Sequence, residues 1–336
     1  MNNYFYIFFL FFILVLFLKS NVIGNKLRVL SEPDSIRKFQ ERPVPQVGGI
    51  IFFLVIISLA IIDSKIILLS LKELVPSVGI NIFFFFISFF LLFLIGFIDD
   101  RKNLDPKTKL VFLIFIAYIL LSAISLNDKI YVRLSFYKNI DLFHFHNLVL
   151  ILFFVFLINA LNMFDGLNLQ SSIIFLTVNI YIIFYIGFEP LIVIIIMFLL
   201  IFSFFNYKNQ AYLGDCGIYL LTFTTFNFLL KIYKNEVFKV SLDEFFILLI
   251  LPICDCVRVI LLRLNQKSNP FLGDRKHFHH LILNKFSYNF SVFVIAIGTL
   301  MPIVLYKILN LGFFISLLFF ILYYFLILNI RGLKSE

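Results

Sequence analysis

Long apolar segments, separated by short polar stretches, dominate this sequence. About eleven of them approach the roughly 20 residues that a helix needs to cross the hydrocarbon core of a bilayer. A hydrophobic content of 62% with only 14% charged residues is too apolar for a soluble domain of 336 residues. We therefore expect an all-α, polytopic integral membrane protein that forms a single domain over 1–336. The expected transmembrane helices lie near 3–18, 47–62, 78–98, 110–126, 146–161, 172–188, 190–205, 218–233, 244–262, 289–307 and 311–330.

The first apolar segment and the cysteines exclude two other interpretations. Segment 3–18 has the length of a signal peptide, but it lacks a basic stretch before it and a small-residue cleavage motif. We therefore expect it to remain as the first helix. Cys216, Cys254 and Cys256 show no spacing typical of metal ligands, and we expect small apolar residues or reduced thiols instead of a disulfide framework.

Lys and Arg residues are distributed unequally between the connecting segments. Most of the 28 basic residues fall on one side, near 19–46, 99–109, 206–217 and 263–288 and after 330. The positive-inside rule places this side in the cytoplasm, with the N-terminus outside and the C-terminus cytoplasmic. The net charge of +9 then lies on a surface suited to anionic lipid or phosphate, and it gives no reason to expect nucleic acid.

Two adjacent carboxylates, Asp99 and Asp100, end the apolar run that begins at Val78. Ionisable groups at such a boundary are costly unless they are solvated, paired or used, and two in tandem also repel each other. A charged end to a helix and a functional site both fit this pattern.

Two further polar groups lie on the same predicted side. Asn159, Asn162 and Asp165 recur at a spacing of three, so a helix would place them roughly along one face. Asn159 alone is typical of polar contacts between membrane helices, whereas the group ending in Asp165 favours a hydrated site in the segment 162–171. Asp215 stands between two glycines before a helix, where it fits both an N-cap and a ligand for a hard cation such as Mg²⁺.

Charged residues and histidines form the last polar group. Asp255 and Arg258 lie three positions apart, which predicts a structural ion pair, and Arg263 is placed nearer to water to contact phosphate. Three of the five histidines fall within 277–280, directly after two basic residues. Zinc ligation is one interpretation, but no Cys or acidic ligand stands at a familiar spacing. A basic segment that contacts a diphosphate suits the neighbouring residues better.

Taken together, these motifs resemble one known family. A Pro-x-x-Gly-Gly stretch (45–49), the Asp-Asp pair, Asn-x-x-Asn-x-x-Asp-Gly (159–166), Gly-Asp-x-Gly (214–217) and Asp-Arg-x-His-x-His-His (274–280) occur in order. The chain is similar to the polyprenyl-phosphate N-acetylhexosamine-1-phosphate transferases of glycosyltransferase family 4. Its histidine motif looks like that of the bacterial branch that uses undecaprenyl phosphate and GlcNAc-1-phosphate.

The resemblance implies a reaction and its participants. N-acetylhexosamine-1-phosphate would pass from a UDP-sugar to undecaprenyl or another polyprenyl phosphate with release of UMP, starting an O-antigen, capsule or teichoic-type polysaccharide. It implies an enzyme that depends on Mg²⁺, with Mn²⁺ as an alternative, in the bilayer of a bacterial cytoplasmic (inner) membrane, and it is compatible with a homodimer. By matching motifs, the catalytic pair is Asp99 and Asp100, the metal ligands are Asn162 and Asp215, and the substrate-binding residues are Asp165, Asn168, Arg263, His277, His279 and His280. Arg42 is added to the substrate-binding residues by its position only.

Two departures from the family pattern keep alternatives open. Asn168 stands where bacterial relatives commonly carry Asp, and Ile218 where they commonly carry Ser, so altered uracil recognition or reduced activity is the risk. A catalytically impaired family member is therefore one alternative. Another is a transporter or flippase for a nucleotide sugar or lipid-linked sugar. A transporter is expected to carry its polar residues near the bilayer midplane, whereas these motifs gather at one face.

Overall fold

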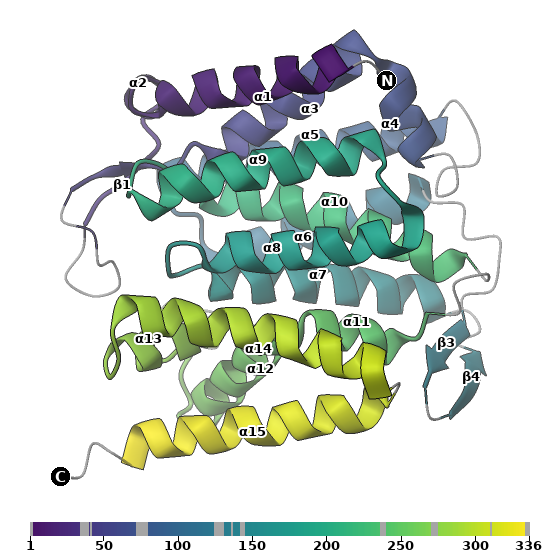
Figure 1. The fold of residues 1–336 in the computed structure, drawn as a ribbon, viewed down its shortest axis with the longest axis vertical. Coiled ribbons are helices and arrows are strands. Elements are labelled where there is room, and N and C mark those ends of the chain that lie inside the picture. The colour runs from purple at the N-terminus through teal and green to yellow at the C-terminus, as the bar shows by residue number, and fades with distance from the viewer. Residues whose placement is uncertain are drawn as a thin grey trace.

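The computed structural model describes residues 3–33, 40, 42–71, 80–123, 131–135, 137–141, 145–235, 240–269, 275–309 and 311–332. Helices that run roughly side by side make up nearly all of this structure (Figure 1). A helix lies at every expected apolar segment. These helices are α1 (Asn3–Leu18), α3 (Gly48–Ile62), α5 (Ile80–Lys102), α6 (Pro106–Ala123), α7 (His146–Phe164), α8 (Gln170–Ile186), α9 (Pro190–Tyr207), α10 (Gly214–Lys234), α11 (Leu242–Leu248), α12 (Ile250–Asn265), α14 (Tyr288–Leu309) and α15 (Gly312–Gly332).

Shorter elements connect these helices at the two ends of the bundle. A hairpin of β1 (Leu30–Ser31) and β2 (Val44–Pro45) lies at one end, and a hairpin of β3 (Tyr131–Leu134) and β4 (Tyr137–Asp141) lies at the other. Both hairpins are antiparallel, and Leu30 pairs with Pro45 in the first. The remaining short helices are α2 (Ser20–Leu27), α4 (Ser64–Leu71) and α13 (Phe278–Leu283).

The helices fit a polytopic membrane protein. Among the described residues, six helices are long and apolar enough to cross a membrane, or up to eight if each of two bent pairs forms one span. The all-α polytopic class is therefore confirmed, whereas the count of about eleven spans is not. The orientation also stays a prediction, which impermeant labelling of a cysteine placed at the exposed Lys267 would test.

The expected ninth span is two helices instead of one. α11 ends at Leu248, and α12 leaves it at 83°. Pro252 explains the break, because a proline removes one helical N–H and its ring clashes with the carbonyl group four residues earlier, here that of Leu248. The bend sends α12 away from α11, and α12 then packs between α7 and α15.

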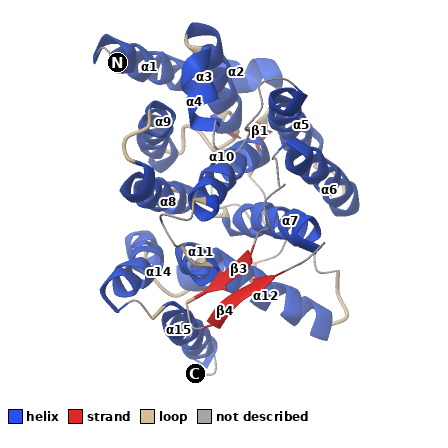
Figure 2. Cartoon of the chain, turned by 90° about the vertical axis from the view of Figure 1, so that its right-hand side faces the viewer, coloured by secondary structure: helices blue, strands red, loops and turns tan. Residues whose placement is uncertain are grey.

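Helix α10 is the centre of the bundle. It contacts α3, α5, α7 and α8, and nearly all of its side chains are buried, including Lys231 at its far end. In the end-on view, α10 lies among these helices, and α11, α12, α14 and α15 pack on the other side of α7 and α8 (Figure 2). The core around α10 is therefore the fixed part against which the polar motifs are placed.

Two glycines allow neighbouring helices to touch the first turn of α10. A Cβ atom at Gly49 of α3 would lie 2.2 Å from the Gly217 nitrogen, and one at Gly96 of α5 would lie 2.4 Å from the Cys216 Cα. Small residues permit this backbone approach, which is a general way to pack membrane helices. The Pro-x-x-Gly-Gly motif therefore has a packing role at Gly49.

We expect Gly96→Ala to lower the thermal midpoint of the purified protein in detergent. The added methyl would overlap backbone atoms of α10, and overpacking of this kind costs about 1–3 kcal/mol. Gly298→Ala is the matched control in α14, where the methyl would meet only the flexible Leu251 side chain at 3.2 Å. Equal thermal midpoints for the two variants would contradict this account of the α5–α10 contact.

Candidate active site

The carboxylates of α5 and α10 share one lysine. The Lys109 ammonium forms an ion pair with Asp99, and its Nζ lies 3.2 Å from Asp215 Oδ2. Asp99 is buried, and its Oδ1 accepts a hydrogen bond of 2.8 Å from the Leu104 N–H. Lys109 and Asp215 keep about a quarter of their side-chain surface exposed (24% each), so the cluster opens to one end of the bundle.

Asp100 has a different environment from its neighbour. Its Oδ1 accepts the Asp215 N–H at 2.7 Å, and its Oδ2 lies 3.2 Å from the Cys216 nitrogen. These amides belong to the first turn of α10, where backbone N–H groups lack helical partners and the helix dipole favours negative charge. Asp100 therefore caps α10 from another helix. Gly214, with φ of +73°, leaves room for this carboxylate.

The interpretation of Asp215 as an N-cap is wrong. Leu213 occupies the N-cap position of α10, and Asp215 lies inside the first turn. Its backbone nitrogen is satisfied by Asp100, so its carboxylate is free to face Lys109 and the side chain of Asn162. Asn162 comes from the last turn of α7, as the spacing of the asparagine motif predicted.

Asp165 follows directly after α7 and is turned toward the start of α8. Ser171 donates a hydrogen bond to Asp165 Oδ1. Removal from bulk water, together with the negative charge of Asp215, raises the pKa of Asp165 to about 6, although the Ser171 hydrogen bond opposes this rise. Asp165 is thus a carboxyl group that changes charge close to neutral pH.

Side-chain amides connect the end of α7 with the end of α9. Asn168 Nδ2 donates to Asn209 Oδ1 at 2.7 Å, and the Leu169 N–H donates to Asn206 Oδ1 at the same distance. The Tyr212 hydroxyl lies 3.3 Å from Asn209 Oδ1 and also 3.3 Å from Gln40 Oε1. Asn168 therefore has a defined hydrogen-bond partner, Asn209, among these polar side chains.

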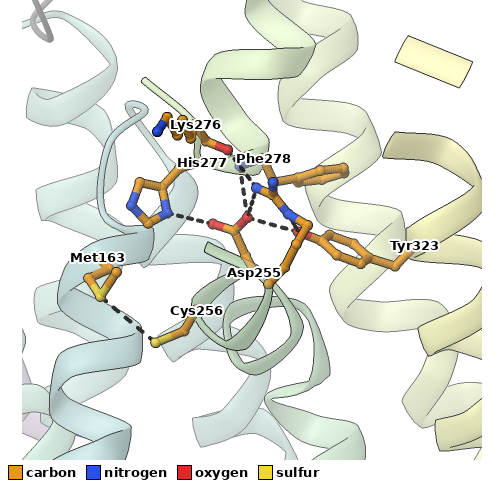
Figure 3. A network of polar contacts seen from close by, with 8 residues as sticks. Met163, Asp255, Cys256, Lys276, His277, Phe278 and Tyr323 are labelled. Atoms are coloured by element: carbon orange, nitrogen blue, oxygen red, sulfur yellow. Dashed lines mark hydrogen bonds and ion pairs between the residues drawn. The ribbon is translucent and has the colours of Figure 1, made fainter. Parts of the chain in front are cut away.

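Asp255 of α12 lies at the centre of a buried network of hydrogen bonds (Figure 3). The predicted ion pair with Arg258 is confirmed, at 2.7 Å between Asp255 Oδ1 and Arg258 Nη2. The same Oδ1 accepts the Tyr323 hydroxyl at 2.8 Å and the Phe278 N–H at 3.0 Å. Asp255 Oδ2 lies 2.8 Å from His277 Nδ1. One carboxylate thereby joins α12, the start of α13 and the last helix, α15.

The three predicted histidines lie together, and each is almost fully buried. The His277 and His279 rings are nearly parallel with centroids 5.8 Å apart, and His280 lies 4.2 Å from His279. His279 packs on Gly166, where a Cβ would lie 2.0 Å from its Nε2. This contact joins the histidine motif to the Asp-Gly motif.

Burial limits what His279 can contribute. It lowers the pKa of His279 well below the usual value, and the neighbouring His280 acts in the same direction. His279 is therefore neutral near pH 7. His279 packs between Phe164 and the other two imidazoles and adds no positive charge to the basic segment.

The other positions named from the sequence have different environments. Arg42 is exposed shortly before β2, at the same end of the bundle. Arg263 is buried in the last turn of α12, so the expectation that it lies nearer to water is wrong. Ile218 is fully buried in α10, so the departure at this position concerns core packing. The first part of the histidine motif, including Asp274, lies outside the described residues.

Oxygen ligands for a hard cation converge at the Lys109 cluster. Asp99 and Asp215 already face one positive group, and the Asn162 amide lies beside Asp215. Carboxylate and amide oxygens of this kind suit Mg²⁺. Within the part of the chain that the structure describes, no three His, Cys, Asp or Glu side chains form a metal-ligating group, and the three cysteines are free and buried.

Lys109 is the site residue that sequence reasoning missed. The expected helix began at 110, whereas α6 begins at Pro106, and Asp105 Oδ2 accepts the Lys107 N–H at 3.0 Å. An Asp before a Pro is a usual start of a helix. This signal in the sequence would have placed Lys109 in the first turn of α6, next to the end of α5.

Comparisons of the sequence with known proteins find one matching family and several similar proteins. Residues 82–233 match the model of glycosyl transferase family 4, which covers α5 to α10 and both carboxylate motifs. An undecaprenyl-phosphate alpha-N-acetylglucosaminyl 1-phosphate transferase of Thermotoga maritima is 28% identical over 79% of this chain and 76% of its own length. Proteins of the same name from Salmonella typhi and Escherichia coli are each 26% identical over 82% of this chain and 74% of theirs. The chain is therefore similar to glycosyl transferase family 4 over residues 82–233, and to these undecaprenyl-phosphate transferases over most of its length.

Proposed function

We propose that this protein transfers N-acetylhexosamine-1-phosphate from a UDP-sugar to undecaprenyl phosphate or another polyprenyl phosphate, with release of UMP. The relatives named above support phosphoglycosyl transfer to a polyprenyl phosphate. The lipid-linked product would start a cell-envelope polysaccharide.

The observation that carries this proposal is the cluster of Asp99, Lys109 and Asp215 at one end of the bundle. Both substrates are anionic, and catalysis of phosphoryl transfer consists mainly of positioning and charge neutralisation. An oxygen of the lipid phosphate would attack the β-phosphorus, form a new P–O bond and displace UMP. The Lys109 ammonium would pair with that lipid phosphate. Asp99 would accept the proton that a protonated lipid phosphate carries.

We also propose that the oxygens of Asn162 and Asp215 hold Mg²⁺, with Mn²⁺ as an alternative. The ion would supply positive charge to the diphosphate when bound. The ion pairs of Lys109 with Asp99 and Asp215 support this proposal, because they place positive charge beside the Asp215 carboxylate. Asp100 would support this group structurally, because its carboxylate already accepts hydrogen bonds from the first turn of α10.

The remaining expected residues are assigned to the donor substrate. Asp165, Asn168 and the exposed Arg42 would contact the nucleotide, and Asn168 is hydrogen-bonded to Asn209, which lies 3.3 Å from the Tyr212 hydroxyl. Arg263, His277, His279 and His280 would line the diphosphate and sugar side. The hydrogen bond from Asn168 to Asn209 shows that the amide at this position has a fitting partner.

A transporter fits the site less well. Secondary transporters place substrate groups near the bilayer midplane at broken helices. Here the two carboxylate motifs lie at the last turn of α5 and the first turn of α10, at a helix end. We propose that this end faces the cytoplasm of a bacterial inner membrane, where UDP-sugars are available.

The test of the function is UMP release by the protein in detergent with undecaprenyl phosphate and a panel of UDP-sugars. We expect UMP and labelled lipid only when both substrates and Mg²⁺ are present, and no turnover after chelation. Asp215→Ala is expected to abolish turnover under the same conditions. Binding of UDP-sugar without UMP release across the panel would contradict the transferase activity and favour an impaired family member or a transporter. Flux in proteoliposomes would then test the transporter.

Asp99→Asn and Asp100→Asn are expected to separate chemistry from support. Asp99→Asn should reduce UMP release to near background at saturating substrate with little change in thermal midpoint, because Asp99 faces Lys109. Asp100→Asn should lower the thermal midpoint, because the amide oxygen can accept from only one of the two N–H groups and its NH₂ group would face the other. Equal effects of both changes on both measurements would contradict the division of roles.

The rate at limiting UDP-sugar should rise with pH through about 6. Asp165 gains its charge as the pH passes its raised pKa of about 6, and only the carboxylate can accept hydrogen bonds with both oxygens. Measured as kcat/KM between pH 5 and 8, this acidic limb should disappear in Asp165→Asn. Persistence of the limb in that variant would assign it to another group.

A further inference from the structure

We propose that Asp255 is a positioning residue that fixes the protonation and orientation of His277, and that Tyr323 of the last helix completes this support. The inference rests on the proposed function for the role of His277. The hydrogen-bond geometry, however, belongs to this chain independently of the substrate.

The two oxygens of Asp255 face different partners. Oδ1 faces three donors, which are Arg258 Nη2 at 2.7 Å, the Tyr323 hydroxyl at 2.8 Å and the Phe278 N–H at 3.0 Å. Oδ2 faces His277 Nδ1 at 2.8 Å. A carboxylate paired with a guanidinium accepts only, so the ring nitrogen that faces it carries a proton. The structure therefore assigns Nδ1–H to His277.

This assignment leaves Nε2 as the edge of the imidazole that is available to a ligand. The second ring nitrogen of His277, Nε2, points away from the network around Asp255 (Figure 3). The ring plane is held from the other side by His279, which is stacked at an interplanar angle of 6° and rests on Gly166. A partner that fixes one nitrogen of an imidazole sets the chemistry of the other.

Tyr323 brings the C-terminal helix into the site. Its hydroxyl donates to Asp255 and accepts from Arg258 Nε at 2.8 Å, so it connects both members of the ion pair. The side chain is 7% exposed. Arg258 Nη2 also donates to the Lys276 carbonyl at 2.6 Å, which fixes the backbone directly before His277. The last helix therefore supports the orientation of a residue that is distant in sequence.

The Asp255→Asn variant tests the assignment of the proton. Three donors converge on Oδ1, so the amide must keep its oxygen there and turn its NH₂ group toward His277. That group donates, and His277 Nδ1 must then accept, which moves the proton to Nε2. We expect ¹⁵N NMR of histidine-labelled protein to show a protonated Nδ1 at His277 in the wild type and an unprotonated Nδ1 in the variant. Loss of the signal in His277→Gln identifies it among the five histidines.

The rate measurement then separates positioning from structural support. With the proton on the wrong nitrogen, kcat should fall by roughly 10- to 100-fold, by more than KM changes, as for other partners that orient a functional imidazole. An unchanged His277 spectrum in Asp255→Asn, or a wild-type kcat with an inverted spectrum, would overturn the proposal. The spectrum is read without substrate, so failure of the proposed transferase reaction is distinguishable from failure of this inference.

A matched pair of variants covers the case in which Asp255→Asn does not fold. Tyr323→Phe and Tyr306→Phe each remove one buried hydroxyl that donates to a buried carboxylate, and the two side chains are 7% and 8% exposed. Tyr306 bonds Glu244 near the far end of α14, about 27 Å along that helix from its first residue, Tyr288. We expect similar losses of thermal midpoint, but a several-fold lower kcat only for Tyr323→Phe. Equal kcat values for the pair would overturn the role of Tyr323.

Discussion

The approach of α3 and α5 to the first turn of α10 is the contact on which the site depends. At Gly49 and Gly96 no side chain separates these backbones, so the end of α5 lies directly against the start of α10. Asp100 then caps α10 from the neighbouring helix, and Asp99 is left to face Lys109 and Asp215. Backbone packing in the apolar core thus determines the distance between Asp99 and Asp215, the two carboxylates that face Lys109.

The second half of the site depends on a buried charge. Removing a carboxylate from water is costly unless its oxygens are paired and hydrogen-bonded, and Asp255 meets this condition with four donors. These donors come from α12, from the segment that leads into α13, and from α15. The cost of leaving the charge unpaired is what holds the histidine segment in one place. His279 then contacts Gly166, which joins this half to the end of α7.

Local patterns predicted much of the fold and part of the site. A helix lies at each expected apolar segment, because the length of an apolar run is read directly from the sequence. The Asp255–Arg258 pair was predictable, since residues three apart in a helix are neighbours. The break before α12 was missed, although Pro252 signals it. Lys109 was missed because its helix was expected to start too late. Asp215 was open to two interpretations because a cap and a ligand use the same residue type.

The sequence by itself determined the membrane class, the helical segments and the order of the polar motifs, because these follow from apolar length and residue type along the chain. Only the tertiary structure decided which carboxylate has which environment. Asp99 and Asp100 are adjacent in sequence, yet one faces an ammonium and the other faces two backbone N–H groups. The same holds for Tyr323, which nothing in its apolar segment distinguishes. Such differences depend on how helices distant in sequence pack, because each polar group takes the partner that the neighbouring helix brings to it.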